Sequence, residues 1–127
     1  MYRYRDNDGS TRTSVARANK HISKVGKITC IRGYVYFGKH STYHTAVLVK
    51  GTAGSARFSG FSWGYDGEGP TGLRTVLKSL GILNDRDILR IATLPKWPNF
   101  NESCRSWQIN FDNWHYTIEI GTTEKIK

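Results

Sequence analysis

Residues 57–81 read RFSGFSWGYDGEGPTGLRTVLKSLG and bring an aromatic run, a series of glycines and an apolar stripe together in one stretch. The aromatic residues occupy alternate positions, which is the spacing of a strand: Phe61, Trp63 and Tyr65. Pro70 suits the first turn of a helix, and Gly81 suits a left-handed helix end. Between them, four apolar residues recur at helical spacing: Leu73, Val76, Leu77 and Leu80. The stretch therefore predicts a strand, a glycine loop and an amphipathic helix over residues 70–80.

The chain before this stretch is rich in β-branched and aromatic residues, which are typical of strands. We predict strands over residues 28–37, with a bulge at Gly33, and over residues 43–50. A polar turn over residues 38–42 separates them, and residues 55–63 supply a third strand. Short links between three successive strands indicate an antiparallel arrangement.

The chain after the helix predicts further strands. Residues 88–94 are interpreted as a strand and residues 96–103 as an ordered loop. Residues 105–111 and 114–120 predict a hairpin with a two-residue turn at 112–113, where Asp and Asn tolerate positive φ. The expected fold class is α+β, an antiparallel sheet of about five to six strands with one main amphipathic helix packed on it.

The charge of the chain is unevenly distributed. The chain has 127 residues, which is long enough for one domain. It contains 19 Lys and Arg residues and 10 Asp and Glu residues. Residues 1–27 hold seven basic and two acidic residues, +5 of the net +9, and few apolar ones. We therefore predict a loosely packed basic arm over 1–27, in which a short helix over 14–24 could form. We expect a single domain over 28–121 and a polar tail over 122–127.

The basic balance favours anionic partners, such as nucleic acid, nucleotides or acidic surfaces, although a merely solvated surface is the simpler alternative. Cys30 and Cys104 are too few for a disulfide framework, so we expect a reducing, cytoplasmic location. No apolar run has membrane-spanning length, and polar residues rather than a signal sequence follow Met1. His40 and His44 lack a nearby third ligand, so no metal site is expected.

Residues 60–64 match the G-x-S-x-G pattern of a hydrolase nucleophile elbow. An elbow must stand between a parallel strand and a helix, whereas here the helix begins only at Pro70 and the strands look antiparallel. Ser62 is therefore interpreted as a strand residue. Because no other catalytic constellation is evident, we expect neither an enzyme nor a cofactor.

The glycine loop is the main candidate binding site. Its backbone amides and the following helix N-terminus could form an anion pocket, and Asp66 or Glu68 would suit ribose hydroxyls. Arg57 and Arg74 are the leading phosphate contacts, and we expect replacement of either by Ala to weaken binding. The candidate ligand-binding residues are Arg57, Phe61, Trp63, Tyr65, Asp66, Gly67, Gly69, Arg74 and Arg105. The alternative is that the glycines only allow tight turns and that Trp63 is core.

A second hypothesis is a nucleic-acid-binding module that uses the basic arm and exposed aromatic residues. Its candidate contacts are Arg3, Arg5, Arg12, Arg17, Lys20, Lys24 and Lys27. A third is a protein that inhibits a nuclease or defence complex.

The pattern GF-x-WGY-x-G-x-GP-x-x-L, which spans residues 60–73, resembles small uncharacterised domains of phages and prokaryotes. In those domains a Y-x-G turn precedes the pattern, as at residues 36–38, and an LP pair followed by tryptophan comes after it. Here that pair is Leu94 and Pro95, followed by Trp97 or Trp107.

The expected architecture is also similar to that of phage anti-Thoeris sponge proteins of the first Tad type, which sequester cyclic ADP-ribose signals without cleaving them. This resemblance implies non-enzymatic sequestration of a nucleotide-type immune signal, either cyclic ADP-ribose or a cyclic nucleotide. It further implies a viral anti-defence role in the host cytoplasm. Because such sites often form between copies of a chain, we expect a homo-oligomer.

Overall fold

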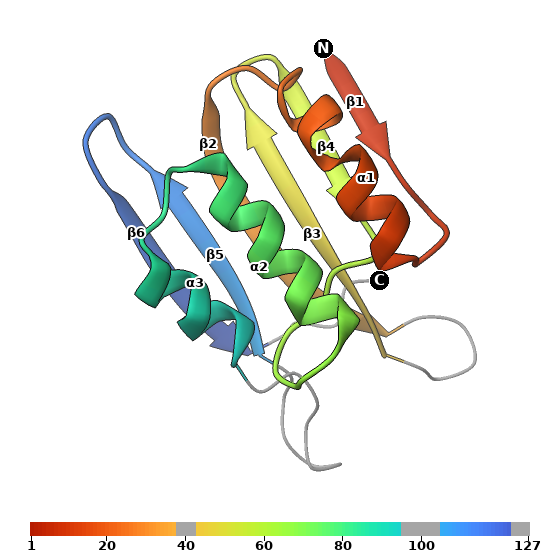
Figure 1. Ribbon diagram of the computed structural model, residues 1–127. Helices are drawn as coiled ribbons and strands as arrows, with labels where there is room; N and C mark the ends of the chain where they lie inside the picture. Colours follow the sequence, from red (N-terminus) through yellow and green to blue (C-terminus); the bar gives the residue numbers. More distant parts are fainter. Residues whose placement is uncertain (38–42, 95–104, 123–127) are drawn as a thin grey trace.

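The computed structural model describes residues 1–37, 43–94 and 105–122, which form one sheet and three helices (Figure 1). The elements follow one another as β1 (Tyr2–Arg5), α1 (Thr11–Ile22), β2 (Ile28–Phe37), β3 (Tyr43–Gly51), β4 (Gly54–Phe58), α2 (Glu68–Leu80), α3 (Asp85–Ala92), β5 (Arg105–Phe111) and β6 (Tyr116–Thr122).

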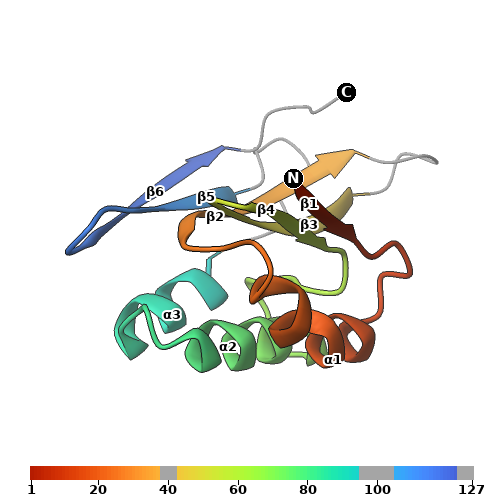
Figure 2. The ribbon, with the colours of Figure 1, turned by 90° about the horizontal axis from the view of Figure 1, so that it is seen from above.

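The six strands lie in the order β1-β4-β3-β2-β5-β6. β1 pairs with β4 in parallel, and every other neighbouring pair is antiparallel. All three helices pack against the same face of the sheet (Figure 2). The predicted α+β class and the strand number are therefore confirmed, and the parallel β1 is the one departure from an antiparallel sheet.

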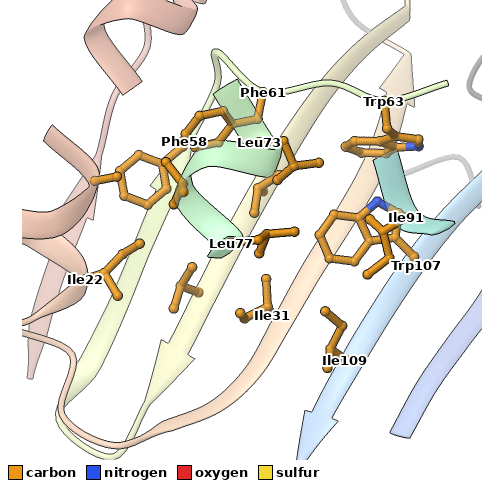
Figure 3. Packing of buried hydrophobic residues seen from close by; sticks show 14 of the residues in the cluster. Ile22, Ile31, Phe58, Phe61, Trp63, Leu73, Leu77, Ile91, Trp107 and Ile109 are labelled. Carbon is orange, nitrogen blue, oxygen red and sulfur yellow. The ribbon is translucent and has the colours of Figure 1, made fainter. Parts of the chain in front are cut away.

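The hydrophobic core lies between the sheet and the helices (Figure 3). The predicted apolar stripe of α2 faces this core. Leu73, Val76 and Leu77 are buried, and Leu80 is partly buried. Alternate residues of β2 and β3 face it from the sheet: Ile31, Val35, Val47 and Val49. Trp63 and Trp107 meet edge to face, with ring centroids 5.5 Å apart, a preferred aromatic geometry.

β2 and β3 form over the predicted ranges, but the irregularity in their pairing is displaced. The register shifts between Ile28 and Cys30 rather than at Gly33. Gly33 pairs regularly with Val47 on one side and Trp107 on the other. The glycine leaves room for the Trp107 ring instead of forming a bulge.

The N-terminal segment belongs to the domain, so the prediction of a loosely packed arm over 1–27 is wrong. β1 extends the sheet beside β4, and α1 buries Ala18 and other apolar residues in the core. Asp6, buried between them, accepts hydrogen bonds from Ser14 Oγ (2.8 Å), Ser59 N (2.6 Å) and Ser59 Oγ (2.5 Å). A buried carboxylate needs such partners, so contacts with residues distant in sequence fix this segment.

Residues 88–94 were expected to form a strand, but most of them belong to α3. Asn84 caps the helix, since its Oδ1 accepts a hydrogen bond from Asp87 N at 2.8 Å. Ile88, Ile91 and Ala92 are buried at helical spacing. The short apolar run fits both the two-residue period of a strand and the 3.6-residue period of a helix. The N-terminal cap and packing against the core select the helix.

β4 ends at Phe58 instead of continuing to Trp63 as predicted. The chain leaves the sheet at Gly60, where an added Cβ would lie 2.1 Å from the carbonyl oxygen of Ser10. The Gly60 amide donates to Ser14 Oγ at 3.0 Å. This close approach of α1 redirects the chain toward the helical layer.

The β5–β6 hairpin is confirmed, but its loop has four residues, 112–115, instead of two. Asp112 N donates to His115 O at 2.8 Å, and Phe111 pairs with Tyr116. Trp114 therefore lies in the loop, 94% exposed, instead of on the apolar face of a strand.

Some predicted features lie outside the described residues: the polar turn over 38–42, the loop over 96–103, His40, Cys104 and the tail over 123–127. Within the described ranges, no helix combines the length and apolar character needed to cross a membrane.

Candidate functional site

The face of the sheet opposite the helices, called the open sheet face below, is basic and aromatic. Successive strand side chains point to opposite faces, and Ala56 and Phe58 of β4 are buried against the helices. Arg57 between them therefore lies on the open sheet face. The same alternation and the strand register place six further residues there: Arg3, Arg5, Arg32, Tyr34, Tyr36 and Lys50.

Three of the arginines share one row across the sheet. Arg5 pairs with Arg57, Arg57 with Leu48, and Leu48 with Arg32. Because neighbouring strands lie about 4.8 Å apart, the row spans roughly 14 Å. A chain of phosphates crossing the strands would therefore meet several guanidinium groups in succession.

Arg57 lies over the two tyrosines at the centre of this face. Its Nε donates to Tyr34 Oη at 2.5 Å, and its Cζ lies 5.7 and 5.5 Å from the ring centroids of Tyr34 and Tyr36. Burial by itself would lower the pKa of Arg57, but hydrogen bonds to both tyrosines outweigh it and raise the pKa. The guanidinium therefore stays charged and holds the rings in place.

Acidic residues are scarce on the open sheet face. Of the described Asp and Glu side chains, only Glu119 lies there, on the edge strand β6. Among the described residues, none of the five cations forms an ion pair with a carboxylate. The face therefore presents uncompensated positive charge to an approaching anion.

A cavity of about 500 Å³ lies beyond the ends of β1 and β4, and we call it the end cavity. Aromatic and polar side chains line it, among them Tyr36, His44, Tyr65, Asn7, Asp8 and Ser59. Tyr36 stacks on His44 with ring centroids 5.5 Å apart. Because Tyr36 also belongs to the open sheet face, the end cavity adjoins that face.

The loop that carries Asp8 into the end cavity is fixed at several points. Ser10 N donates to Asp8 Oδ1 at 2.9 Å, and this bond is the main reason why the pKa of Asp8 lies below its usual value. Gly9 N donates to Ser59 Oγ at 3.0 Å, and its φ of +69° suits glycine. Asp8 is therefore held ionised at neutral pH.

The predicted ligand-binding residues converge only in part. Phe61 and Trp63 are 1% and 0% exposed, so their rings belong to the core and cannot stack on a ligand, which corrects that part of the prediction. Phe61, Tyr65 and Gly69 all line the end cavity. Asp66 is exposed beside it, and Gly67 is the N-terminal cap of α2.

Arg57 and Arg74 lie in opposite layers of the molecule, so the expected pocket containing both does not form. Arg74 is exposed on α2, where it lines a groove with Lys78 and Asp85 of α3. The side chain of Arg105 lies outside the described part of the structure.

The glycine loop has a clear structural role. A Cβ at Gly69 would lie 1.9 Å from Ser62 Oγ, and Gly64 N donates to the carbonyl of Ala92 at 2.7 Å. Ser62, expected in a strand, instead lies in the connection and shares a hydrogen bond of 2.7 Å with Tyr65 Oη. The glycines thus allow α2 and α3 to pack closely against this connection.

The cations proposed for nucleic-acid binding divide between the two layers. Arg3 and Arg5 lie on the open sheet face. Four others lie on or next to α1, in the helical layer: Arg12, Arg17, Lys20 and Lys24. Lys27 precedes β2, and its Nζ donates to Asn113 Oδ1 at 3.3 Å.

The sequence patterns did not single out Arg32, Tyr34 or Tyr36 as site residues, although Lys50 was a possible phosphate contact. The first three occupy alternate positions of β2, a spacing that could have indicated one shared face. What the sequence did not show was that this face has no helix over it.

In the described ranges, no group of three or more His, Cys, Asp or Glu side chains is arranged to hold a metal ion. Comparison of the chain with protein-family models, with curated proteins and with solved structures finds no match.

Proposed function

We propose that the protein binds single-stranded nucleic acid on the open sheet face. The observation that carries this proposal is the combination, on one face without a helix, of five cations and two tyrosines. The cations would contact phosphates, and bases would stack on the tyrosine rings and on the Arg57 guanidinium plane. A duplex would offer this surface mainly phosphates, since its bases are already stacked, so single strands fit better.

The platform is partly organised before any ligand arrives. The ring centroids of Tyr34 and Tyr36 lie 5.9 Å apart. Arg32, which is also on β2, places its Cζ 5.5 Å from the ring centroid of Tyr34. Rigid aromatic groups lose little conformational entropy on binding. The proposed activity is binding without chemical change of the ligand, in the cytoplasm, where single strands are accessible.

The first test is the salt dependence of binding to fluorescently labelled oligouridine and oligothymidine, measured by anisotropy. We expect log K to fall linearly with log salt, with a slope of about −0.7 for each phosphate contact on a single strand. The absence of binding at low salt would exclude the proposal.

The second test compares single arginine substitutions in opposite layers. We expect Arg57→Ala and Arg32→Ala each to weaken binding about tenfold, because each removes a charge-assisted contact. Arg74→Ala removes the same charge from the helical layer and should change affinity by less than about twofold. Equal losses for all three variants would show that binding does not use the open sheet face.

Sequestration of a cyclic nucleotide signal remains a second proposal, because the end cavity adjoins the glycine loop. Of the described residues that line this cavity, none is Lys or Arg, which is unfavourable for a pyrophosphate. Calorimetric titration with cyclic ADP-ribose isomers and cyclic oligonucleotides tests it, and no heat of binding at micromolar protein would exclude it. Assembly into a homo-oligomer is likewise a prediction, tested by sedimentation equilibrium.

A further inference from the structure

The end cavity has the size and lining of a site for the base of a nucleotide, not for its phosphate. Its volume of about 500 Å³ is typical of small-ligand pockets. Four aromatic residues line it: Tyr36, His44, Phe61 and Tyr65. Phe61 is 1% exposed, whereas Tyr65 is 46% exposed. The carboxylate of Asp8 would repel a phosphate, and none of the described lining residues is Lys or Arg; the charge that acts on Asp8 comes from Arg17 on α1, outside the lining.

The position of the cavity connects it to the proposed strand-binding surface. Tyr36 contributes to both, and its neighbour Tyr34 lies on the open sheet face. A strand whose bases stack on these tyrosines would pass the mouth of the cavity. One base could then turn into it while the neighbouring phosphates stay on the arginines.

The chemistry of Asp8 selects among the bases. An ionised carboxylate only accepts hydrogen bonds, and it has two oxygens to do so. Guanine presents two adjacent donors, N1–H and the 2-amino group, on its Watson–Crick edge, whereas adenine, cytosine and uracil each present one donor there beside acceptors. A carboxylate can therefore bind guanine through two hydrogen bonds side by side.

We propose that the end cavity receives one unpaired guanine of the bound strand, with Asp8 accepting from its Watson–Crick edge and the cavity rings contacting its faces. This inference rests on the proposed function. The contacts that fix the loop, from Gly9 N to Ser59 Oγ and from Ser10 N to Asp8 Oδ1, hold the carboxylate in position before binding.

The test uses oligouridines of about ten nucleotides, within the range of known single-strand sites, that carry one central guanosine, inosine or adenosine. We expect the guanosine oligomer to bind about tenfold more tightly than the adenosine oligomer, as for a bidentate base contact. Inosine keeps N1–H but lacks the 2-amino group, so its oligomer should bind with intermediate affinity.

Asp8→Asn should remove this preference while leaving affinity for plain oligouridine unchanged or slightly higher. Asp66→Asn is the matched control, because Asp66 is an exposed carboxylate that does not line the cavity, and it should keep the preference. Circular dichroism checks that both variants are folded. Equal binding of the three oligomers, or a preference that survives in Asp8→Asn, would overturn the guanine site and leave strand binding intact. No binding of any oligomer would overturn both proposals.

Discussion

Gly33 shows how one residue without a side chain lets a large ring enter the core. A Cβ at this position would lie only 2.1 Å from Cε2 of Trp107. The buried indole would have to move to remove this steric clash. We predict that Gly33→Ala lowers the free energy of unfolding by about 1–3 kcal/mol, the usual cost of overpacking. Urea unfolding followed by tryptophan fluorescence measures the change.

Gly121→Ala provides the matched control for this substitution. Gly121 also lies in the sheet, on β6, but its Cβ would meet only Ser106 Oγ, at 3.8 Å. The control should be as stable as the parent chain within about 0.5 kcal/mol. If Gly33→Ala behaved in the same way, the indole would not be held as the structure describes.

His21 makes stability depend on pH. Its ring stacks on Tyr4 with centroids 3.5 Å apart, and its Nδ1 shares a hydrogen bond with Tyr2 Oη. Burial and the nearby charges of Lys20 and Lys24 lower the pKa of His21 below its usual value. The unfolded chain therefore binds more protons in the interval between the lowered pKa and the ordinary one.

In that interval the free energy of unfolding must rise with pH, and it should level off above about 6.5. Urea unfolding at a series of pH values measures this slope. We predict that His21→Gln makes the curve flatter. An unaltered slope in His21→Gln would mean that another group causes the dependence.

At the scale of elements, the connection from β4 to α2 is held by an aromatic anchor. Trp63 is fully buried and meets Trp107 of β5, so it joins the connection to a strand on the other side of the core. We predict that Trp63→Ala lowers the free energy of unfolding by about 3–5 kcal/mol.

Trp114→Ala is the matched control, since it truncates the same side chain where the indole is 94% exposed. Chemical denaturation of both variants should show a large loss for the first and a change below about 0.5 kcal/mol for the second. Comparable losses in the two variants would contradict the described packing.

At the scale of the whole molecule, the N-terminal segment completes the fold rather than extending from it. Removing residues 1–27 deletes β1 and α1 together with three core residues: Ala18, Ile22 and Val25. We predict that the truncated chain loses its cooperative thermal transition, measured by far-ultraviolet circular dichroism.

The charge of this segment can be tested without removing its backbone. Lys20→Ala combined with Lys24→Ala takes two exposed charges from the end of α1 and should keep the cooperative transition. A truncated chain that still unfolded cooperatively would show that residues 1–27 are the independent arm that their composition suggests.

The two layers of the molecule have different roles in the proposed activity. The helices cover one face of the sheet and share the hydrophobic core with it (Figure 2). The open sheet face displays cations and rings. Binding on one face and stability from the other would allow variants such as Arg32→Ala to change affinity without unfolding the protein.

The sequence by itself determined the features that depend on local pattern. The spacing of Leu73, Val76 and Leu77 specified α2, and β-branched residues specified β2 and β3, because a helix or strand needs only its own period and its end signals. The net charge and the abundance of aromatic residues likewise pointed to an anionic ligand with flat groups, a prediction that remains to be tested.

Only the tertiary structure decided which residues meet. Asp6 accepts hydrogen bonds from Ser59, and β1 pairs in parallel with β4. The sheet separates Arg57 from Arg74, although both flank the same loop. The local spacing of apolar residues does not predict which strands pair or which face of the sheet the helices cover. Both depend on contacts between residues far apart in sequence. The open sheet face and the end cavity arise from those long-range contacts, which is why the sequence could name Arg57 as a candidate contact but not the residues that surround it.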